Sequence, residues 1–493
     1  MPLLSPAHGP RPAFSRIGSV LHCEDVNLAD LAERLEGPAY VYSRRQIEEN
    51  FTAWERGFSA HPHLVCYAVK ANPTRGILTL LARLGAGFDT VSIGEVERAL
   101  RAGADPKKIV FSGVGKSERE LERAVDLSLY SINVESESEL LRLMRVTERL
   151  RRPARISLRC NPNVNPNTHP YISTGLLNNK FGIPMRDVPR LYRLAHEHPW
   201  LEPVGIDCHI GSQITTIGPF TESVDKLLDM VELLRSEGIR LTHLDIGGGL
   251  GIVYTARDRP PDPAKLVEEV RAHMTARNLE DLTLLAEPGR SIVGNAGVLL
   301  TKVEYIKTGP TKTFCIVDAA MTDLIRPALY DAWMAIEPVV ERAAASYGCG
   351  GARVRIHRRS RKKPRTRHPR GRLPGDFRRR SLRREHGEQL QQPGASDGVS
   401  RRWRAGPHVA HSADVAGLHT WRSRSLTLPA RQNDKRVRIA CTNGRALLQS
   451  FHAECGNFPH PAFFVFVIFT SHMCFHALFP KCTHTAKGRN YAH

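Results

Sequence analysis

Residues 64–113 read "LVCYAVKANPTRGILTLLARLGAGFDTVSIGEVERALRAGADPKKIVFSG". Three short apolar runs in it, 64–70, 87–92 and 108–113, have the length and composition of buried strands. The segment 92–103 lies between two of them and is amphipathic with helical spacing. The stretch therefore predicts strands that alternate with helices, which is the pattern of a parallel α/β fold.

The same pattern continues along the chain on the C-terminal side. Five more candidate strands follow, at 130–136, 155–162, 204–211, 241–249 and 282–290. Amphipathic segments such as 117–125 and 137–146 fill the gaps, and acidic or hydroxyl residues at their starts suit helix N-termini. Eight repeats of strand then helix predict a (β/α)8 barrel.

Composition divides the 493 residues into two unlike parts. Residues 351–493 hold 29 Lys and Arg against 7 Asp and Glu, a net charge of +22, whereas residues 1–350 come to −2. Residues 1–18 have no apolar core behind a charged start, so we expect no signal peptide and a cytoplasmic protein. The cysteines of the first part show no metal-type spacing, so we expect free core thiols and no metal site: Cys23, Cys66, Cys160, Cys208 and Cys315.

In such a barrel the active site lies where the strands end. The residues at those positions are polar, charged or glycine: Lys70, Asp89, Ser112, Glu135, Arg159, His209, Gly247 to Gly249, Glu287 and Arg290. A full ring of such residues favours an enzyme over a purely structural barrel.

Three features of this ring indicate a particular chemistry. Lys70 ends an apolar run and is placed for Schiff-base chemistry, although a surface lysine with a buried stem would look the same. The glycines of "DIGGGLG" (245–251) can present backbone N–H groups to a phosphate. Glu287 could face a protonated ring nitrogen and Arg290 a carboxylate, unless the two simply pair with each other. Together these groups describe a site for pyridoxal 5'-phosphate.

Longer motifs resemble a known family. "YAVKAN" (67–72), "HIGSQI" (209–214), "DIGGGLGI" (245–252) and "EPGRSIVGNAG" (287–297) resemble the fold-type III, alanine-racemase-like pyridoxal-phosphate decarboxylases. "NPNVNPNTHPYISTGLLNNKFGI" (161–183) and "DAAMTDLIRPALYDAW" (318–333) are similar to the diaminopimelate decarboxylases rather than to the ornithine or arginine enzymes. The resemblance covers about residues 14–340.

The resemblance implies roles for individual residues. Lys70 and His209 would be catalytic, with Lys70 bound covalently to the cofactor and His209 stacked on its ring. The implied cofactor contacts are Lys70, Asp89, Arg159, His209, Ser212, Gly247, Gly248, Gly249, Glu287, Pro288, Gly289 and Arg290. Arg290, Arg326 and Tyr330 would contact the substrate.

The resemblance also implies the reaction, which is loss of carbon dioxide from meso-2,6-diaminopimelate to give L-lysine, the last step of lysine biosynthesis. Family members usually work as homodimers. Two alternatives stay open: an ornithine- or arginine-type decarboxylase, and a non-catalytic barrel that only carries pyridoxal phosphate.

The expected domains follow from these assignments. Residues 1–38 should contribute to a second, β-rich domain, 39–292 should form the barrel, and 293–345 should begin the rest of the β domain. We expect residues 346–493 to be a non-native basic tail without stable structure. The family's "CESGD"-like motif, which gives the partner subunit a cysteine and a glutamate, is absent here, and so is a late "AYG…SNYNSR".

A shift of the reading frame restores both motifs. "HGEQLQQP" (386–393) can be encoded by codons that, read one base later, give Met-Ala-Ser-Asn-Tyr-Asn-Ser-Arg. "GCGGARVRI" (348–356) permits Asp-Val-Val-Gly-Pro-Val-Cys-Glu-Ser by the same step. The sequence therefore predicts a one-base slip near residues 340–348 and an impaired product.

Two other interpretations of the tail fit less well. A nucleic-acid arm would interleave its basic residues with aromatic residues or glycines, yet 351–385 holds only Phe377 as an aromatic residue, so we expect no specific nucleic-acid partner. The apolar run 461–479 contains two histidines and is short for a membrane span, so we expect no membrane partner.

Overall fold

The computed structural model describes residues 12–165, 180–255, 257–310, 313–330 and 332–341, together with four short strands at 346–351, 438–440, 451–454 and 463–467. All of them lie within one compact unit, residues 1–357 with 423–493. The second unit, residues 358–422, falls outside the described residues.

Eight parallel strands close into a barrel. They are β5 (His63–Ala68), β6 (Gly87–Thr90), β7 (Ile109–Phe111), β8 (Ser131–Val134), β9 (Ala154–Asn161), β11 (Leu201–Asp207), β12 (His243–Asp245) and β13 (Thr283–Ala286). The ring closes because β8 pairs with β9 and β13 pairs with β5. A two-residue strand, β10 (Ile183–Pro184), adds to β9. Every strand expected for the barrel is present, so the predicted fold class is confirmed.

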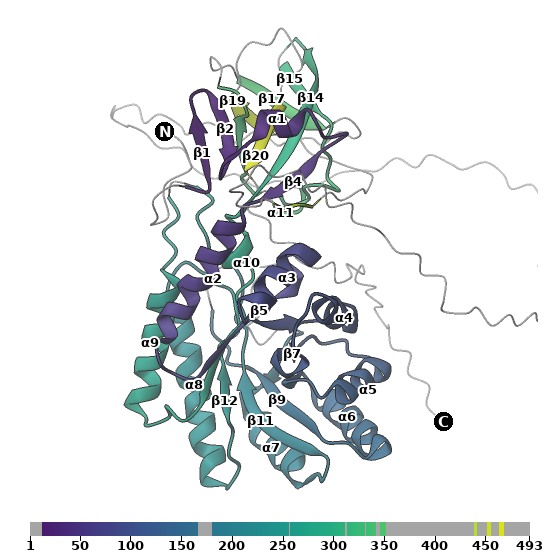
Figure 1. Ribbon diagram of the computed structural model, residues 1–493. Helices are drawn as coiled ribbons and strands as arrows, with labels where there is room; N and C mark the ends of the chain where they lie inside the picture. Colours follow the sequence, from purple (N-terminus) through teal and green to yellow (C-terminus); the bar gives the residue numbers. More distant parts are fainter. Residues whose placement is uncertain are drawn as a thin grey trace, which may run out of the picture. The chain divides into compact units, whose positions relative to one another are not determined.

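Helices surround the parallel strands, as Figure 1 shows. They are α2 (Arg44–Phe58), α3 (Arg75–Arg83), α4 (Ile93–Arg101), α5 (Glu118–Leu127), α6 (Glu137–Leu150), α7 (Val188–Glu197), α8 (Gly218–Ser236), α9 (Pro263–Ala276) and the short α10 (Arg290–Val293). Three begin with the hydroxyl residues seen in the sequence: the side chains of Ser92, Ser117 and Ser136 each accept a backbone N–H of the first turn.

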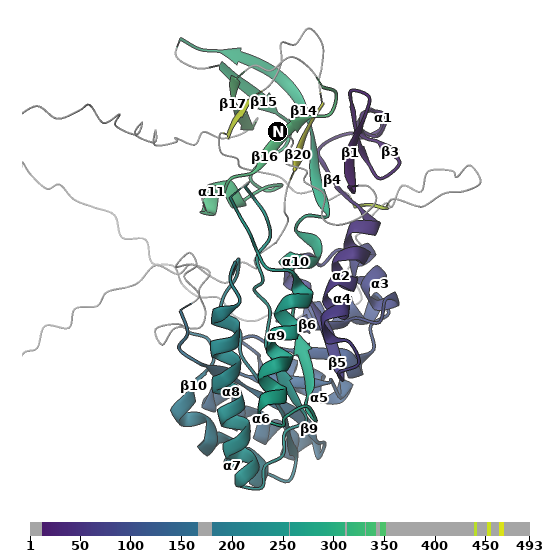
Figure 2. The same ribbon diagram turned by 90° about the vertical axis from the view of Figure 1, so that its left-hand side faces the viewer.

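A β-rich part is assembled from both sides of the barrel segment. The long strand β14 (Gly297–Thr308) pairs with β15 (Thr313–Val317) and with β4 (Ala39–Tyr42), which Figure 2 shows beside it. Strand β4 belongs to this sheet and not to the barrel. The expected start of the barrel at residue 39 is therefore four residues too early, and the barrel segment begins after Tyr42. Residue 39 was misplaced because an apolar strand looks the same in either sheet.

The N-terminal residues form a small sheet of their own. It consists of β1 (Phe14–Ile17), β2 (Val20–Cys23) and β3 (Val26–Asn27), and helix α1 (Leu28–Ala32) follows. Leu21 N donates to Val339 O, next to strand β16 (Ala335–Pro338). An apolar cluster joins these elements to β14 through Val298 and Leu300.

Four short strands lie in the segment where we expected no stable structure. They are β17 (Ser346–Gly351), β18 (Arg438–Ala440), β19 (Phe451–Glu454) and β20 (Phe463–Val467). β20 pairs with both β14 and β16. These strands are exceptions within a segment for which the lack of stable structure stays a prediction. The physical reason is that "FFVFV" consists of aromatic and β-branched residues, which favour strands, and that an open sheet edge offers unpaired backbone groups.

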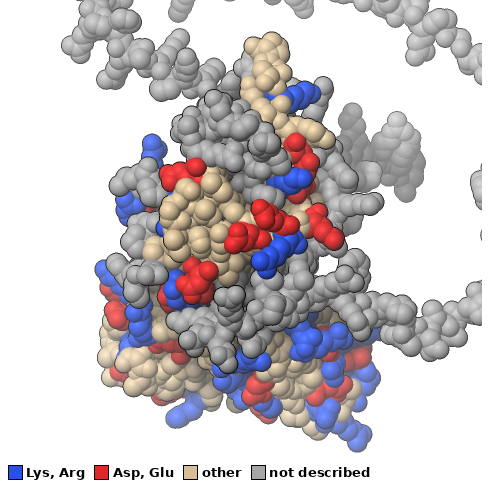
Figure 3. All heavy atoms as spheres, turned by 45° about the horizontal axis from the view of Figure 1, so that its top comes forward, with Lys and Arg blue, Asp and Glu red and all other residues tan. Residues whose placement is uncertain are grey.

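Charges of both signs are mixed over the described surface. On the face in Figure 3, Lys and Arg side chains are interspersed with Asp and Glu side chains. Many are paired, as in Arg190 with Glu137 and Arg193 with Glu237. Among the described helices, none is both long and apolar enough to cross a bilayer.

Candidate active site

The C-terminal ends of the barrel strands bring an ion pair together. Lys70 lies in a single turn of 3-10 helix (Val69–Ala71) that follows β5, and its Nζ is 2.5 Å from Oδ2 of Asp89 in β6. The Asp89 side chain is fully buried, whereas that of Lys70 is 32% exposed. Burial lowers the pKa of Lys70, but the negative charges of Asp89 and Glu287 outweigh it and raise that pKa above its ordinary value. The Lys70 side chain is therefore partly exposed at the barrel mouth, and its amine is held as an ammonium.

Further carboxyl groups are buried in the same barrel mouth. Asp207, Asp245 and Glu287 are at most 5% exposed. Burial, followed by the charge of Asp245, raises the pKa of Glu287 well above its ordinary value. Burial likewise raises the pKa of Asp245 to about 7. Among the described residues, Oε1 of Glu287 and Oδ2 of Asp245 have no hydrogen-bond donor, so this end of the barrel holds acceptors that a polar ligand could satisfy.

The glycine turn after β12 is built by close backbone contacts. A Cβ on Gly247 would lie 2.3 Å from Cys208 O, and one on Gly248 would lie 2.1 Å from Glu287 O. One on Gly249, whose φ is +112°, would lie 2.3 Å from Gly211 O. Since no side chain fits at these positions, the backbone of the turn packs directly on its neighbours.

The same turn orients His209. The N–H of Gly248 donates to Nδ1 of His209 over 3.1 Å. Burial, followed by the charges of Lys70 and Arg159, lowers the pKa of His209 well below its ordinary value. Because Nδ1 accepts a hydrogen bond, the neutral ring carries its proton on Nε2.

The "EPGR" turn after β13 is anchored to β5 and to the glycine turn. Ala68 N donates to Pro288 O over 3.0 Å, and Glu287 N donates to Gly247 O over 2.8 Å. A Cβ on Gly289 would lie 2.8 Å from the Cβ of Ala71. The turn is therefore in contact with the end of β5 and with the glycine turn.

Arg290 binds two hydroxyl groups rather than Glu287. It is 6% exposed, its Nη2 donates to Ser212 Oγ over 2.9 Å, and its Nη1 donates to Tyr254 OH. The simple Glu287–Arg290 pair that the sequence left open is not among the ion pairs of the described residues. The Arg290 guanidinium is thus directed to the two hydroxyl groups and not to the Glu287 carboxyl group.

Arg326 and Tyr330, in α11 (Arg326–Tyr330), join the site through Tyr254. The guanidinium of Arg326 lies 5.2 Å from the ring centre of Tyr254 and 5.5 Å from that of Tyr330. The guanidinium of Arg290 lies 5.7 Å from the same Tyr254 ring. Tyr254 therefore contacts both arginines that were expected to bind the substrate.

Arg159, at the end of β9, completes the ring. Its Nη1 lies 2.8 Å from Oε1 of Glu135, and its guanidinium lies 5.0 Å from the ring centre of Phe181. Arg159 is 7% exposed and Glu135 is 4% exposed. The structure thus brings the expected cofactor residues to one end of the barrel.

Sequence reasoning missed three residues of the site. Asp207 and Asp245 are the last residues of β11 and β12, and an acidic residue at the end of an apolar strand was the available signal. Tyr254 had no signal of its own, because its contacts with Arg290 and Arg326 depend on chain segments far apart in the sequence.

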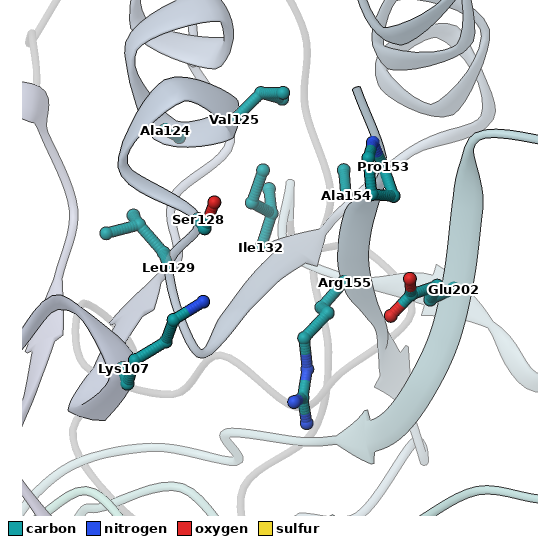
Figure 4. A pocket seen from close by; sticks show the side chains of 10 residues that line it. All are labelled: Lys107, Ala124, Val125, Ser128, Leu129, Ile132, Pro153, Ala154, Arg155 and Glu202. Carbon is teal, nitrogen blue, oxygen red and sulfur yellow. The ribbon is translucent and has the colours of Figure 1, made fainter. Parts of the chain in front are cut away.

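A separate cavity of about 150 Å³ lies at the other ends of the strands. Ile132, Ala154 and Glu202, which line it, come from the beginnings of β8, β9 and β11, and Figure 4 shows the side chains of Lys107 and Arg155 beside them. Because barrel enzymes use the opposite face, this cavity does not belong to the candidate site.

Comparison with known proteins now adds to the geometry. Residues 44–294 match the family model of the pyridoxal-dependent decarboxylases, pyridoxal binding domain. The diaminopimelate decarboxylase of Vibrio cholerae is 53% identical over 323 residues, which cover 65% of this chain and 76% of that protein. The chain belongs to the diaminopimelate decarboxylase family.

Solved structures of the diaminopimelate decarboxylase family agree with this assignment. The Helicobacter pylori enzyme, crystallised with L-lysine, is 40% identical with a TM-score of 0.63, and the match covers 66% of this chain and 81% of that one. The lysine decarboxylase of Selenomonas ruminantium is more distant, at 28% identity and a TM-score of 0.59 over 67% of this chain and 84% of that one. The predicted family, the carboxy-lyase class and the pyridoxal-phosphate cofactor are thereby confirmed.

The residues present fit that cofactor. An accessible amine, buried carboxyl oxygens without donors and a turn from which side chains are excluded are the groups that an aldehyde, a ring nitrogen and a phosphate require. Metal ligation is not needed for any of these contacts.

Proposed function

We propose that the barrel of this chain binds pyridoxal 5'-phosphate and that its in-frame form decarboxylates meso-2,6-diaminopimelate to L-lysine. The observation that carries the proposal is the Lys70–Asp89 pair, 2.5 Å apart at the barrel mouth, with Glu287 and the glycine turn beside it. When bound, the cofactor supplies the electron sink that stabilises the charge left by departing carbon dioxide.

The residues around Lys70 would prepare the site. Lys70 would bind the cofactor through its amine, and Asp89 orients that amine. His209, held by the Gly248 N–H, would present a flat neutral ring for stacking. Glu287 would share a proton with the ring nitrogen, which the burial of its carboxyl group favours.

The remaining cofactor contacts would come from the turns. Gly247, Gly248 and Gly249 would offer backbone N–H groups to a phosphate, and the backbone of Pro288 is fixed against β5. Ser212 and Arg159 complete the proposed set of cofactor contacts. The position of Ser212 is supported by its hydrogen bond from Arg290.

Arg290, Arg326 and Tyr330 would bind the substrate. Diaminopimelate carries a carboxylate at each end, and guanidinium groups bind carboxylates in a bidentate manner. The contact of both arginines with Tyr254 supports a common binding region for them. A mono-carboxylate such as ornithine would not need two arginines.

We also propose that the chain as it stands turns over slowly. The "CESGD"-like and "SNYNSR" motifs are missing, and the frame slip near residues 340–348 accounts for their loss. The in-frame protein would be a homodimer, since the family takes a cysteine and a glutamate from the partner subunit. A cytoplasmic location is supported by five buried, unpaired cysteines among the described residues.

Two measurements test this proposal. The purified 493-residue chain is mixed with pyridoxal phosphate, and we expect visible absorbance of a lysine-bound cofactor that Lys70→Ala abolishes and Lys108→Ala retains. The same absorbance in Lys70→Ala would refute the role of Lys70. Carbon dioxide release is then followed with diaminopimelate, ornithine and arginine in turn. Release from ornithine or arginine alone would refute the substrate, and binding without any release by the frame-restored chain would favour a carrier.

The frame slip is tested on the DNA. Sequencing across codons 335–400 of a fresh isolate should reveal one gained or lost base relative to the family frame. The slip is refuted if the DNA sequence encodes the basic tail and no insertion or deletion of a single base restores both motifs.

A further inference from the structure

A buried ion pair lies behind the candidate site, outside the ring of strand ends. Lys116, in the loop between β7 and α5, is 3% exposed. Its Nζ donates to Glu139 Oε1 over 2.8 Å, to Gly113 O over 2.7 Å and to Asn133 O over 2.7 Å. An ammonium group has three N–H donors, so every one of them is used.

The partner of Lys116 fixes the backbone at the end of β8. Glu139 lies in the first turn of α6 and is 7% exposed. Its Oε2 accepts the backbone N–H of Glu135 over 3.0 Å, while its Oε1 binds Lys116. Both oxygens of one carboxylate are therefore occupied, one by the lysine and one by the main chain of a residue of the candidate site.

Lys116 and Glu139 act on the Glu135 side chain from two directions. Oε1 of Glu135 accepts the N–H of Gly113 over 2.8 Å and binds Arg159 over 2.8 Å. Lys116 holds the carbonyl of Gly113 and Glu139 holds the N–H of Glu135 itself. The position of the Glu135 carboxylate, and hence of Arg159, depends on both members of the buried pair.

Arg159 in turn faces the reactive end of the barrel. Its positive charge lowers the pKa of Lys70 and that of His209, whereas Asp89 and Glu287 raise the pKa of Lys70. A displacement of the Arg159 guanidinium would thus change the electrostatic environment of the amine that we propose binds the cofactor.

We propose that Lys116 and Glu139 are positioning residues of the candidate site: the pair holds Glu135 and Arg159 against the barrel mouth and so sets where the Arg159 charge lies relative to Lys70. The inference rests on the proposed role of Lys70. A buried ion pair adds little net stability compared with apolar residues of the same size, so a role in placing charge explains its presence better than a role in stability.

The experiment measures the reactivity of Lys70 in the cofactor-free full chain. A small acylating reagent labels amines at fixed pH, and peptide mass mapping gives the labelling rate at Lys70. Only the neutral amine reacts, so the rate follows its deprotonated fraction, and half a pKa unit corresponds to about a threefold change. The variant is the double substitution Lys116→Met with Glu139→Leu, which removes both charges together and leaves neither buried alone.

We expect the double variant to fold and its Lys70 to be labelled about threefold more slowly, because the nearby positive charge is no longer held in place. The single substitution Lys116→Arg keeps the positive charge beside Glu139, so Lys70 in that variant should be labelled at close to the wild-type rate. Lys108→Met is the matched control, since Lys108 also donates to a backbone carbonyl, Gly85 O over 3.0 Å, but lies before β7 at the opposite end of that strand. It should leave the Lys70 rate unchanged.

An unchanged Lys70 rate in the folded double variant overturns the inference. If that variant does not fold, Glu139→Gln decides. In either orientation its amide nitrogen would face a donor, the Glu135 N–H or the Lys116 ammonium, and a wild-type rate would again overturn the inference. Cofactor absorbance is recorded separately on the same proteins. Its absence in the wild-type chain would count against the proposed function, whereas the labelling rates test the positioning role without any cofactor.

Discussion

The barrel and the β-rich sheet are assembled from the chain in opposite ways. All eight barrel strands come from residues 63–286, and most of them pair with the next barrel strand along the chain. Strand β14 instead pairs with β4 from residues 39–42 and with β20 from residues 463–467. The barrel is therefore built from local strand–helix units, whereas the sheet depends on segments far apart in sequence.

Because of this difference, a sequence change after residue 345 affects the barrel and the sheet unequally. The described residues of the main apolar cluster, which extends from the barrel into β4, β14 and β15, and both members of the Lys70 pair precede residue 345, so an altered sequence after residue 345 leaves these contacts in place. The sheet, in contrast, includes the later strand β20, "FFVFV". The proposed function involves both parts, since the proposed substrate residues Arg326 and Tyr330 lie after β14 and β15.

The largest expected effect comes from restoring the reading frame after residue 345. We expect lysine release from diaminopimelate to rise about 100-fold or more, the size of a missing acid–base group, while cofactor absorbance changes little. The assay compares the frame-restored chain with the 493-residue chain at equal bound cofactor. Equal rates would mean that residues 1–345 suffice for lysine release. The proposal that function needs both the barrel and the later residues would then be wrong.

Gly248→Ala should damage the barrel and leave the sheet intact. The new Cβ would lie 2.1 Å from Glu287 O, a backbone atom that cannot rotate away. We expect a loss of about 3 kcal/mol in the free energy of unfolding, measured by urea titration, and loss of cofactor absorbance. Gly115→Ala is the control, because a Cβ there meets nothing within 4 Å. The same unfolding midpoint in both variants would contradict the packing argument.

Asp245→Asn should change how barrel stability depends on pH. Burial raises the pKa of Asp245 to about 7 from an ordinary 3.8. Between these values the folded chain keeps a proton that the unfolded chain releases, so stability falls as pH rises from 4 to 7. Asparagine cannot ionise, so the fall should become shallower by about 3 kcal/mol. Denaturant titrations of the wild type and the variant at pH 4 and pH 7 measure the free energy of unfolding. An equal fall in both proteins would contradict the role given to Asp245.

Val465→Pro should have the smallest effect and act on the sheet alone. Val465 pairs with Leu300 across β20 and β14, and proline has no N–H to donate. We expect amide hydrogen exchange in β14 to become a few-fold faster while barrel amides keep their rates. Faster exchange in β5 or β12 would show that the two parts unfold together.

Much of the site could be predicted because parallel strands all end on one face. Lys70, Asp89, His209 and Glu287 each stand at or just after a strand end, so a list of strand ends already contained them. Tyr254, Lys116 and Glu139 could not be found this way, since they lie in a loop or at a helix start and act through contacts with distant residues. The β20 strand was missed because pairing with an open edge depends on the partner strands.

The amino-acid sequence by itself determined the barrel, the family and the identity of the expected cofactor residues, because hydrophobic periodicity and long motifs are local properties of the chain. Only the tertiary structure decided which charges meet: that Lys70 pairs with Asp89, that Arg290 binds Ser212 and Tyr254 instead of Glu287, and that Lys116 stands behind Glu135. Burial and distance set the strength of those interactions, and both arise only when segments remote in sequence pack together.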